Sequence, residues 1–217
     1  MIPIMSNSKL NASIEAIKYI KPKIDLNSII GVGTGSTVNY FIEELVKVKH
    51  LFKGAVSSSE ASTKLLENSG IKVFELNDVN EVHVYIDGAD EVDTFNNLIK
   101  GGGGAHTREK IVASASNEFV CIVDESKLVK TLGDFPLPVE VIIKSRSYVA
   151  REIVKIGGTP KLRKNFLTDQ RNQILDVSDL KIEDPSILEQ KINLIPGVLD
   201  NGIFANCKPQ KVIVGKC

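Results

Sequence analysis

Short apolar runs rich in valine and isoleucine alternate with amphipathic helical segments through the first part of the chain. The apolar runs occupy residues 29–32, 55–56, 71–74, 82–86 and 119–123. The helical segments, whose apolar residues are spaced three and four apart, occupy residues 13–20, 37–46, 60–68 and 107–115. Strands that alternate with helices predict a parallel sheet with helices on both faces and a ligand site at the carboxyl ends of the strands. We therefore expect an α/β fold with a Rossmann-like parallel sheet domain.

The order of elements changes near residue 135. Strands are expected at residues 139–143 and 202–205, extended segments at 161–163 and 173–177, and helices at 147–156 and 185–192. In chain order these elements form a β-α-β-β-α-β series, which is the ferredoxin-like pattern. A last strand at 211–215 is assigned to the first sheet. We expect a Rossmann-like catalytic domain of residues 1–132 plus 208–217, and a second, smaller ferredoxin-like α+β domain of residues 133–207.

Charge and hydropathy exclude several classes of protein. The 27 Lys and Arg residues are balanced by 27 Asp and Glu residues, so no basic surplus is present for binding nucleic acid or an anionic membrane. The longest apolar runs are far shorter than the roughly 18 residues that a membrane span requires. The N-terminus lacks the basic start and long apolar centre of a secretory signal, so we expect a cytoplasmic protein.

The cysteines do not form a recognisable framework. Cys121, Cys207 and Cys217 are widely spaced and include no CxxC pair. This pattern argues against a set of disulfides and against a structural zinc site. We expect free thiols.

A glycine-rich turn, GVGTGST at residues 31–37, follows the first predicted strand and leads into a helix. Such a turn favours anion binding, because backbone N–H groups and the positive end of the helix dipole point to one place. A dinucleotide fingerprint would need glycine at Ser36, and a P-loop would need a lysine in the turn. The hydroxyl-rich loop suits a small phosphate ester, and a turn kept only for close packing is the open alternative. Three serines at residues 57–59 could add donors or simply cap the next helix.

Two further polar segments follow in the sequence. DGADEVD at residues 87–93 lacks the spacing of a calcium-binding loop, so Asp87 and Asp90 are expected to bind sugar hydroxyls. A magnesium site is an open alternative for this segment. A solvated turn with no bound ligand is another, and it applies above all to Asp93. KGGGGAHTREK at residues 100–110 contains four consecutive glycines, which usually persist where a ligand comes very close. A flexible linker is the alternative, and Glu109 could merely complement the dipole of its helix.

The four segments GVGTGST, SSSEAST, DGADEVD and KGGGGAHTREK, in this order and spacing, resemble the type A ribose-5-phosphate isomerases. The resemblance extends through residues 135–141, 195–198 and 203–206, and so covers nearly the whole chain. It implies interconversion of D-ribose 5-phosphate and D-ribulose 5-phosphate in the non-oxidative pentose phosphate pathway, with no metal and no organic cofactor. It also implies a homodimer or a dimer of dimers.

The resemblance assigns the site residues by matching position. Glu109 corresponds to the catalytic base, and Asp87, Asp90 and Lys100 correspond to the other catalytic residues. The segments expected to bind the substrate contain Thr34, Gly35, Ser36 and Thr37, then Asp87, Gly88, Ala89 and Asp90, then Lys100, Gly101, Gly102 and Gly103, and finally Lys127. Lys9 is a weaker candidate for contact with the phosphate.

One departure and two other functions remain open. His106 stands where the family pattern has an apolar residue, one helical turn before Glu109, and could either affect that carboxylate or be a polar residue outside the pocket. A sugar-phosphate sensor would need a DNA-binding module or a partner helix, and none is visible before Ser13. A sugar-phosphate deaminase or CoA transferase would need a catalytic His or a covalent Glu in another motif.

Overall fold

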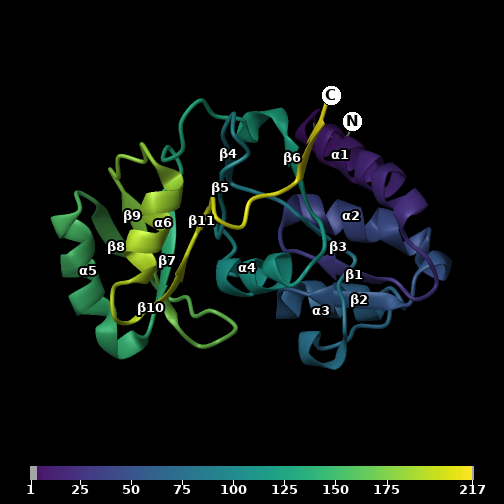
Figure 1. The fold of residues 1–217 in the computed structure, drawn as a ribbon, viewed down its shortest axis with the longest axis horizontal. Coiled ribbons are helices and arrows are strands. Elements are labelled where there is room, and N and C mark those ends of the chain that lie inside the picture. Colours follow the sequence, from purple (N-terminus) through teal and green to yellow (C-terminus); the bar gives the residue numbers. More distant parts are fainter. Residues whose placement is uncertain (1–3, 217) are drawn as a thin grey trace. The chain divides into compact units, whose positions relative to one another are not determined.

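Five parallel strands form a sheet in the order β12-β6-β3-β1-β2 (Figure 1). A computed structural model describes residues 4–216 of the chain. The strands are β1 (Ile29–Val32), β2 (Gly54–Ser57), β3 (Val84–Asp87), β6 (Phe119–Asp124) and β12 (Lys211–Gly215). The α/β prediction is confirmed, as is the placement of the last strand in this sheet.

Two helices cover one face of this sheet. They are α1 (Ile4–Ile20) and α2 (Ser36–Val46), which pack on each other and on the strands. Alternate strand residues join their apolar core, namely Ile30, Val32, Val84, Ile86, Val120 and Ile122. Because successive strand side chains point to opposite faces, Tyr85 and Asp87 belong to the other face. The helix predicted at 13–20 corresponds to α1, which begins earlier, at Ile4.

The chain forms two compact units. Unit 1, which holds the parallel sheet, consists of the chain up to Gly88, Arg108–Lys127 and the chain from Pro209. Unit 2 consists of Ala89–Thr107 and Leu128–Lys208. The domain boundaries expected from the sequence, at 132/133 and 207/208, stay a prediction. The described residues also form α3 (Glu60–Asn68), α4 (His106–Ser114) and short 3-10 helices at Lys21–Lys23, Lys49–Leu51, Leu76–Asp78, Glu125–Lys127 and Ile143–Ser145.

Unit 2 contains the ferredoxin-like arrangement. Its antiparallel sheet has the order β10-β7-β9-β8, and two helices interrupt the strand series along the chain. The elements are β7 (Leu137–Val141), α5 (Arg146–Lys155), β8 (Thr159–Leu162), β9 (Gln173–Ser178), α6 (Pro185–Asn193) and β10 (Val198–Asn201). Asp184 caps α6 by accepting a hydrogen bond from the Ile187 N–H at 3.1 Å. The predicted β-α-β-β-α-β series is thus confirmed in type.

A small antiparallel sheet in unit 2 was not expected from the sequence. It consists of β4 (Glu91–Val92), β5 (Leu98–Ile99) and β11 (Ile203–Phe204), in the order β11-β5-β4. Each strand has two residues, which is too short to give a period-two pattern. The hairpin of β4 and β5 carries Asp90 at its beginning and Lys100 at its end.

Two predicted strands need correction. The run at 71–74 forms only an isolated bridge, Val73 with Ala55, because the chain enters a 3-10 helix at Leu76. The fourth strand of the ferredoxin-like series is β10, and the predicted strand at 202–205 is instead β11 of the small sheet. The chain leaves one sheet for the other at Gly202, where a Cβ atom would lie 2.2 Å from the Lys100 carbonyl oxygen.

The predictions on membrane helices and on cysteines can be compared with the structure for residues 4–216. None of the helices between residues 4 and 216 is long and apolar enough to cross a membrane. Cys121 is buried and Cys207 is half-buried, and no disulfide joins these two described cysteines. Cys217 lies outside the described residues.

Candidate active site

The carboxyl ends of four parallel strands meet at one edge of the sheet in unit 1. The β1 and β3 strands are neighbours, with β2 beside β1 and β6 beside β3. The segments that follow these strands hold predicted site residues: the turn at 33–37, the serines at 57–59, Asp87 with Gly88, and Lys127. The structure therefore brings these segments together, as the parallel topology predicts.

The turn after β1 ends in the N-terminus of α2. Gly35 precedes the helix with a φ of 122°, a conformation that other residues rarely adopt, and Ser36 and Thr37 are the first residues of the helix. The Thr34 hydroxyl lies 3.0 Å from Ser58 Oγ and donates to Ser59 Oγ at 2.8 Å. These two serines thus fix the Thr34 side chain, and Ser59 also caps α3. The turn presents backbone N–H groups and hydroxyls, which suits an anion.

Lys9 contacts this turn from α1. Its Nζ atom donates to Ser36 Oγ at 2.9 Å. The sequence made Lys9 only a weak candidate for contact with phosphate. The position of its ammonium group at the first hydroxyl of α2 strengthens that candidacy, because a positive charge and a helix N-terminus attract an anion together.

Asp87 is fully buried, and both of its carboxylate oxygens accept hydrogen bonds. Its Oδ1 atom accepts hydrogen bonds from the N–H groups of Thr34 and Gly88, at 3.0 and 2.7 Å, and Oδ2 accepts from the Tyr85 hydroxyl at 2.5 Å. Gly33 makes room for this carboxyl group, because a Cβ at that position would lie 2.0 Å from Asp87 Cγ. Gly33, the second glycine of the turn, is therefore needed to leave space for the Asp87 carboxyl group.

Glu109 lies on α4 and is 3% exposed. Its negative charge acts on Tyr85. Burial is the largest cause that raises the pKa of the Tyr85 phenol well above 10.0, and the negative charges of Asp87 and Glu109 raise it further. Tyr85 is therefore a protonated donor in the neighbourhood of two carboxyl groups that the sequence assigns to the site. Sequence reasoning missed this tyrosine, although its place two residues before Asp87 on a strand puts both side chains on one face.

Lys127 follows β6 in a short 3-10 helix and is half-buried. The turn leading to it is fixed by Asp124, which accepts a hydrogen bond from the Ser126 N–H at 3.0 Å. The lysine thus stands at the same edge of the sheet as the turn after β1 and Asp87. Its role in binding the substrate, which the family resemblance implies, stays a prediction.

The other predicted residues, Ala89, Asp90, Lys100 and Gly101 to Gly103, belong to unit 2. The backbone N–H of Asp90 donates to the Ile99 carbonyl at 2.8 Å, and Asp90 Oδ2 accepts from the Gly102 N–H at 2.8 Å. Asp90 is therefore joined to the glycine run across the β4–β5 hairpin. Lys100 is 2% exposed, with Nζ 5.5 Å from the centre of the Phe204 ring.

The glycine run is a folded loop rather than a flexible linker. Gly101 and Gly104 have φ angles of 104° and 79°. A Cβ at Gly104 would lie 2.2 Å from the Phe166 ring, and one at Gly102 would lie 2.8 Å from Asp90 Oδ1. Gly102 and Gly103 are exposed, whereas Gly101 and Gly104 are buried. The run is thus anchored at both ends and presents its middle to the surface.

Several polar residues near these motifs have structural roles. Asp93 accepts from the Phe95 and Asn97 N–H groups, both at 2.8 Å, and so closes the β4–β5 hairpin. His106 is fully buried, with Nε2 3.4 Å from the Asp200 carbonyl oxygen. Among residues 4–216, no group of three or more His, Cys, Asp or Glu side chains could hold a metal ion.

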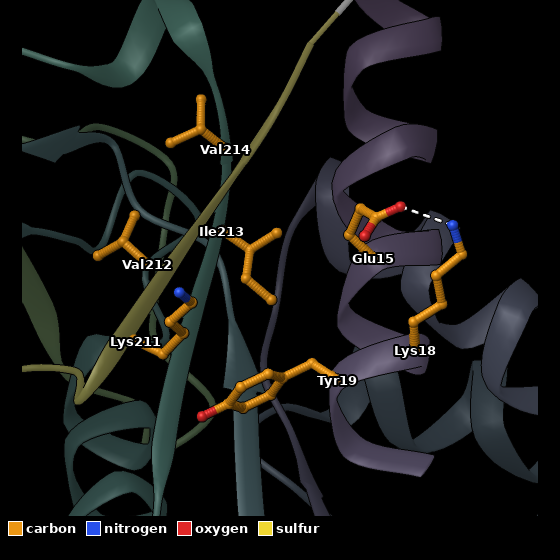
Figure 2. A pocket seen from close by; sticks show the side chains of 7 residues that line it. All are labelled: Glu15, Lys18, Tyr19, Lys211, Val212, Ile213 and Val214. Atoms are coloured by element: carbon orange, nitrogen blue, oxygen red, sulfur yellow. Dashed lines mark hydrogen bonds and ion pairs between the residues drawn. The ribbon is translucent and has the colours of Figure 1, made fainter. Parts of the chain in front are cut away.

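A surface hollow of about 460 Å³ lies elsewhere in unit 1. Figure 2 shows that its lining comes from α1 and from β12, the strand at the edge of the sheet. The lining residues are Glu15, Lys18, Tyr19, Lys211, Val212, Ile213 and Val214. No predicted site residue is among them, so this hollow is separate from the candidate active site.

The chain is similar to known proteins over its whole length. Residues 54–217 match the family described as ribose 5-phosphate isomerase A (phosphoriboisomerase A). Ribose-5-phosphate isomerase A of Legionella pneumophila (strain Lens) is 53% identical over 210 residues, which cover 97% of this chain and 95% of that protein. The crystal structure of ribose 5 phosphate isomerase A from Neisseria gonorrhoeae is 48% identical with a TM-score of 0.93, covering 100% of this chain and 95% of that chain. Ribose 5-phosphate isomerase A from Methanocaldococcus jannaschii is 41% identical with a TM-score of 0.90, covering 97% and 95%. The chain therefore belongs to the ribose 5-phosphate isomerase A family.

Proposed function

We propose that Glu109 is the base in the reaction of this family, the interconversion of D-ribose 5-phosphate and D-ribulose 5-phosphate. The observation that carries the proposal is the burial of this carboxyl group, 3% exposed on α4, within the electrostatic range of Tyr85 beside Asp87. Placed bases contribute about 10²- to 10⁴-fold to proton transfer from carbon. The membership of the chain in the family supports the reaction itself.

The reaction moves one proton between neighbouring carbons of the open-chain sugar. Glu109 removes the proton from C2, and the electron pair of that bond forms a C1–C2 double bond while negative charge passes to O1. O1 then gains a proton, O2 loses one, and the proton held by Glu109 returns to C1. The product carries its carbonyl at C2, and the base is restored to its starting form.

We propose that Lys100 stabilises the negative charge that develops on the enediolate oxygen. A fixed cation is most effective where water is excluded, and Lys100 is 2% exposed. Asp87 and Asp90 would accept hydrogen bonds from sugar hydroxyls, and Asp87 would assist proton movement at the sugar oxygens. Backbone N–H groups donate to each carboxyl group, those of Thr34 and Gly88 to Asp87 and that of Gly102 to Asp90.

The phosphate group is assigned to the turn before α2. Thr34, Gly35, Ser36 and Thr37 offer hydroxyls and backbone N–H groups at a helix N-terminus. Lys9 and Lys127 would add positive charge. Binding the phosphate, which does not react, supplies the energy that positions the reacting carbons.

We also propose, as the family resemblance implies, that the enzyme needs no metal or organic cofactor and forms a homodimer or a dimer of dimers, and we expect it in the cytoplasm. The decisive assay follows ribose 5-phosphate conversion with and without EDTA. Equal turnover in both conditions supports the proposal. Turnover that EDTA abolishes would contradict metal-free chemistry and would favour a metal site in the acidic segment at 87–93. Absence of turnover in both conditions would favour a sugar-phosphate sensor. Light scattering after gel filtration tests the dimer.

A further inference from the structure

Arg163 of unit 2 binds the carbonyl groups of the glycine run. Its Nη1 atom donates to the Gly101 carbonyl at 3.2 Å and to the Gly102 carbonyl at 3.1 Å. The two residues lie in a segment that the family resemblance assigns to substrate binding, yet Arg163 is about sixty positions further along the chain. The motifs in the sequence give no indication of this contact.

The guanidinium group is itself held in place. Nε and Nη2 of Arg163 donate to Oδ2 and Oδ1 of Asp176, at 2.9 and 2.5 Å. These two parallel hydrogen bonds fix the plane of the guanidinium group, which one hydrogen bond alone would not do. The Arg163 side chain is 17% exposed and lies with Cζ 5.2 Å from the centre of the Phe166 ring. The N–H of Arg163 also donates to the Ile174 carbonyl at 2.9 Å, which continues the β8–β9 pairing.

The loop needs such support because glycine is conformationally free. Four glycines in sequence have more accessible backbone states than any other four residues, and the entropy of ordering them opposes the bound conformation. Arg163 holds two consecutive carbonyls, while Asp90 holds the N–H of Gly102 at 2.8 Å. Gly102 is thereby fixed on both sides of its Cα atom. These hydrogen bonds restrain the backbone of the loop.

We propose that Arg163 is a positioning residue that preorganises the Lys100–Gly103 segment for the substrate, and that Asp176 acts through Arg163. The arginine has no direct role in the chemistry. Its effect passes through the backbone of Gly101 and Gly102. The proposal rests on the proposed function in one respect, that Lys100 and the glycines contact the sugar phosphate.

The kinetic test uses Arg163→Gln, with Arg151→Gln as the matched control. Arg151 is an exposed arginine on α5 of the same unit. We expect Arg163→Gln to raise KM for ribose 5-phosphate by about tenfold or more and to change kcat less, because the loop must then be ordered at the expense of binding. Arg151→Gln should match the unaltered enzyme. An unchanged KM in a folded Arg163→Gln enzyme would overturn the proposal.

Arg163→Lys protects the test against a variant that does not fold. Lysine keeps the charge but cannot bind two carbonyls and both carboxylate oxygens at once, so KM should still rise, though less than in Arg163→Gln. The Asp176→Asn variant should raise KM too, and the double variant should be no worse than Arg163→Gln alone. Additive effects in the double variant would refute the claim that Asp176 acts through Arg163.

Hydrogen exchange gives a local readout that does not depend on turnover. The amides of residues 100–104 should exchange faster in Arg163→Gln than in the unaltered protein, while the amides of α5 should not change. Unchanged protection of residues 100–104 would contradict preorganisation. Lys100→Ala separates the two proposals: if it keeps normal kcat and KM, the proposed function of the segment fails. If Lys100→Ala is impaired and the Arg163 variants are normal, only the positioning role fails.

Discussion

The Tyr85 hydroxyl donates to Oδ2 of Asp87 at 2.5 Å, from a ring that is fully buried. The ring packs 5.2 Å from that of Phe119 on the neighbouring strand, with an angle of 42° between the two planes. Strand alternation explains the contact, since residues two apart on β3 point to the same face. A buried donor is thus built into the same strand as the carboxylate that it orients.

Removing this hydroxyl should impair activity more than folding. In Tyr85→Phe the ring still packs on Phe119, but Asp87 Oδ2 loses the hydroxyl donor of Tyr85, while the N–H groups of Thr34 and Gly88 still donate to Oδ1. Hydrogen bonds to charged groups contribute about 1.5–3 kcal/mol. We expect kcat/KM to fall by about tenfold or more, measured by steady-state assay, with a cooperative unfolding transition retained. Normal kcat/KM would show that the orientation of Asp87 does not depend on Tyr85.

The same tyrosine predicts a loss of stability at alkaline pH. Burial and two negative charges raise the pKa of Tyr85 above 10.0 in the folded protein, so the folded state keeps a proton that the unfolded chain releases. This contribution is fully present below about pH 10 and is lost as the pH rises further, by at most about 1.4 kcal/mol per pH unit. Denaturant unfolding at pH 8.5, 9.5 and 10.5 should show a smaller decline for Tyr85→Phe. Equal declines in both proteins would contradict the assignment.

Gly33→Ala should displace Asp87. The added Cβ would lie 2.0 Å from Cγ and Oδ1 of the carboxyl group, a distance that real atoms do not adopt. Because a misplacement of about 1 Å can cost a hundredfold in rate, we expect kcat/KM to fall by about that factor. Steady-state assays, with circular dichroism as a check on folding, provide the measurement. Activity within threefold of normal would mean that Asp87 tolerates displacement.

Lys9→Ala should weaken phosphate binding. The Lys9 ammonium lies 2.9 Å from Ser36 Oγ at the start of α2, and we expect KM to rise about three- to tenfold with little change in kcat. Inhibition by inorganic phosphate should weaken in parallel. Lys18→Ala is the matched control, because Lys18 lies on the same helix, is 66% exposed and pairs with Glu15. If both variants behave alike, Lys9 has no specific role.

Glu140 is a test of stability rather than activity. This fully buried carboxyl group accepts from the hydroxyls of Thr107 and Thr168, at 2.5 and 2.7 Å, and from Asn172 Nδ2 at 3.0 Å. Glu140→Gln places an amide N–H₂ against donors, so the free energy of unfolding should fall by about 1–3 kcal/mol. Denaturant titration measures this, and Glu183→Gln, at an exposed position, should change it little. A Glu140→Gln protein as stable as the original would show that the donors find other acceptors.

The sequence predicted the parts of the fold that have a strong local pattern. The strands β1, β3 and β6 are buried apolar runs ended by polar or glycine residues, and their carboxyl ends hold the predicted site segments. β10 was missed because its Asp200 and Asn201 are polar although buried, which hides the strand pattern. The run at 71–74 has the composition of a strand, but only Val73 forms a bridge.

The site was predictable where a motif is continuous in sequence and not where it depends on distant residues. The glycine turn, Asp87, Asp90, Lys100 and Glu109 lie in recognisable motifs. The residues that hold these groups in place, such as Arg163, lie outside those motifs. The contacts that Arg163 makes with Gly101 and Gly102 arise from the pairing of β8 with β9, and no short pattern encodes a contact across about sixty residues.

If Glu109 removes and returns the proton, its loss should abolish proton exchange at the carbons of the substrate. Ribose 5-phosphate is incubated in D₂O with the enzyme or with Glu109→Gln, and deuterium at C2 of the aldose and at C1 of the ketose is followed by NMR, with binding measured by calorimetry. We expect Glu109→Gln to bind ribose 5-phosphate within severalfold of the unaltered enzyme but to exchange and isomerise at least about 10²-fold more slowly. Isomerisation and exchange at near-normal rates in Glu109→Gln would contradict this role of Glu109.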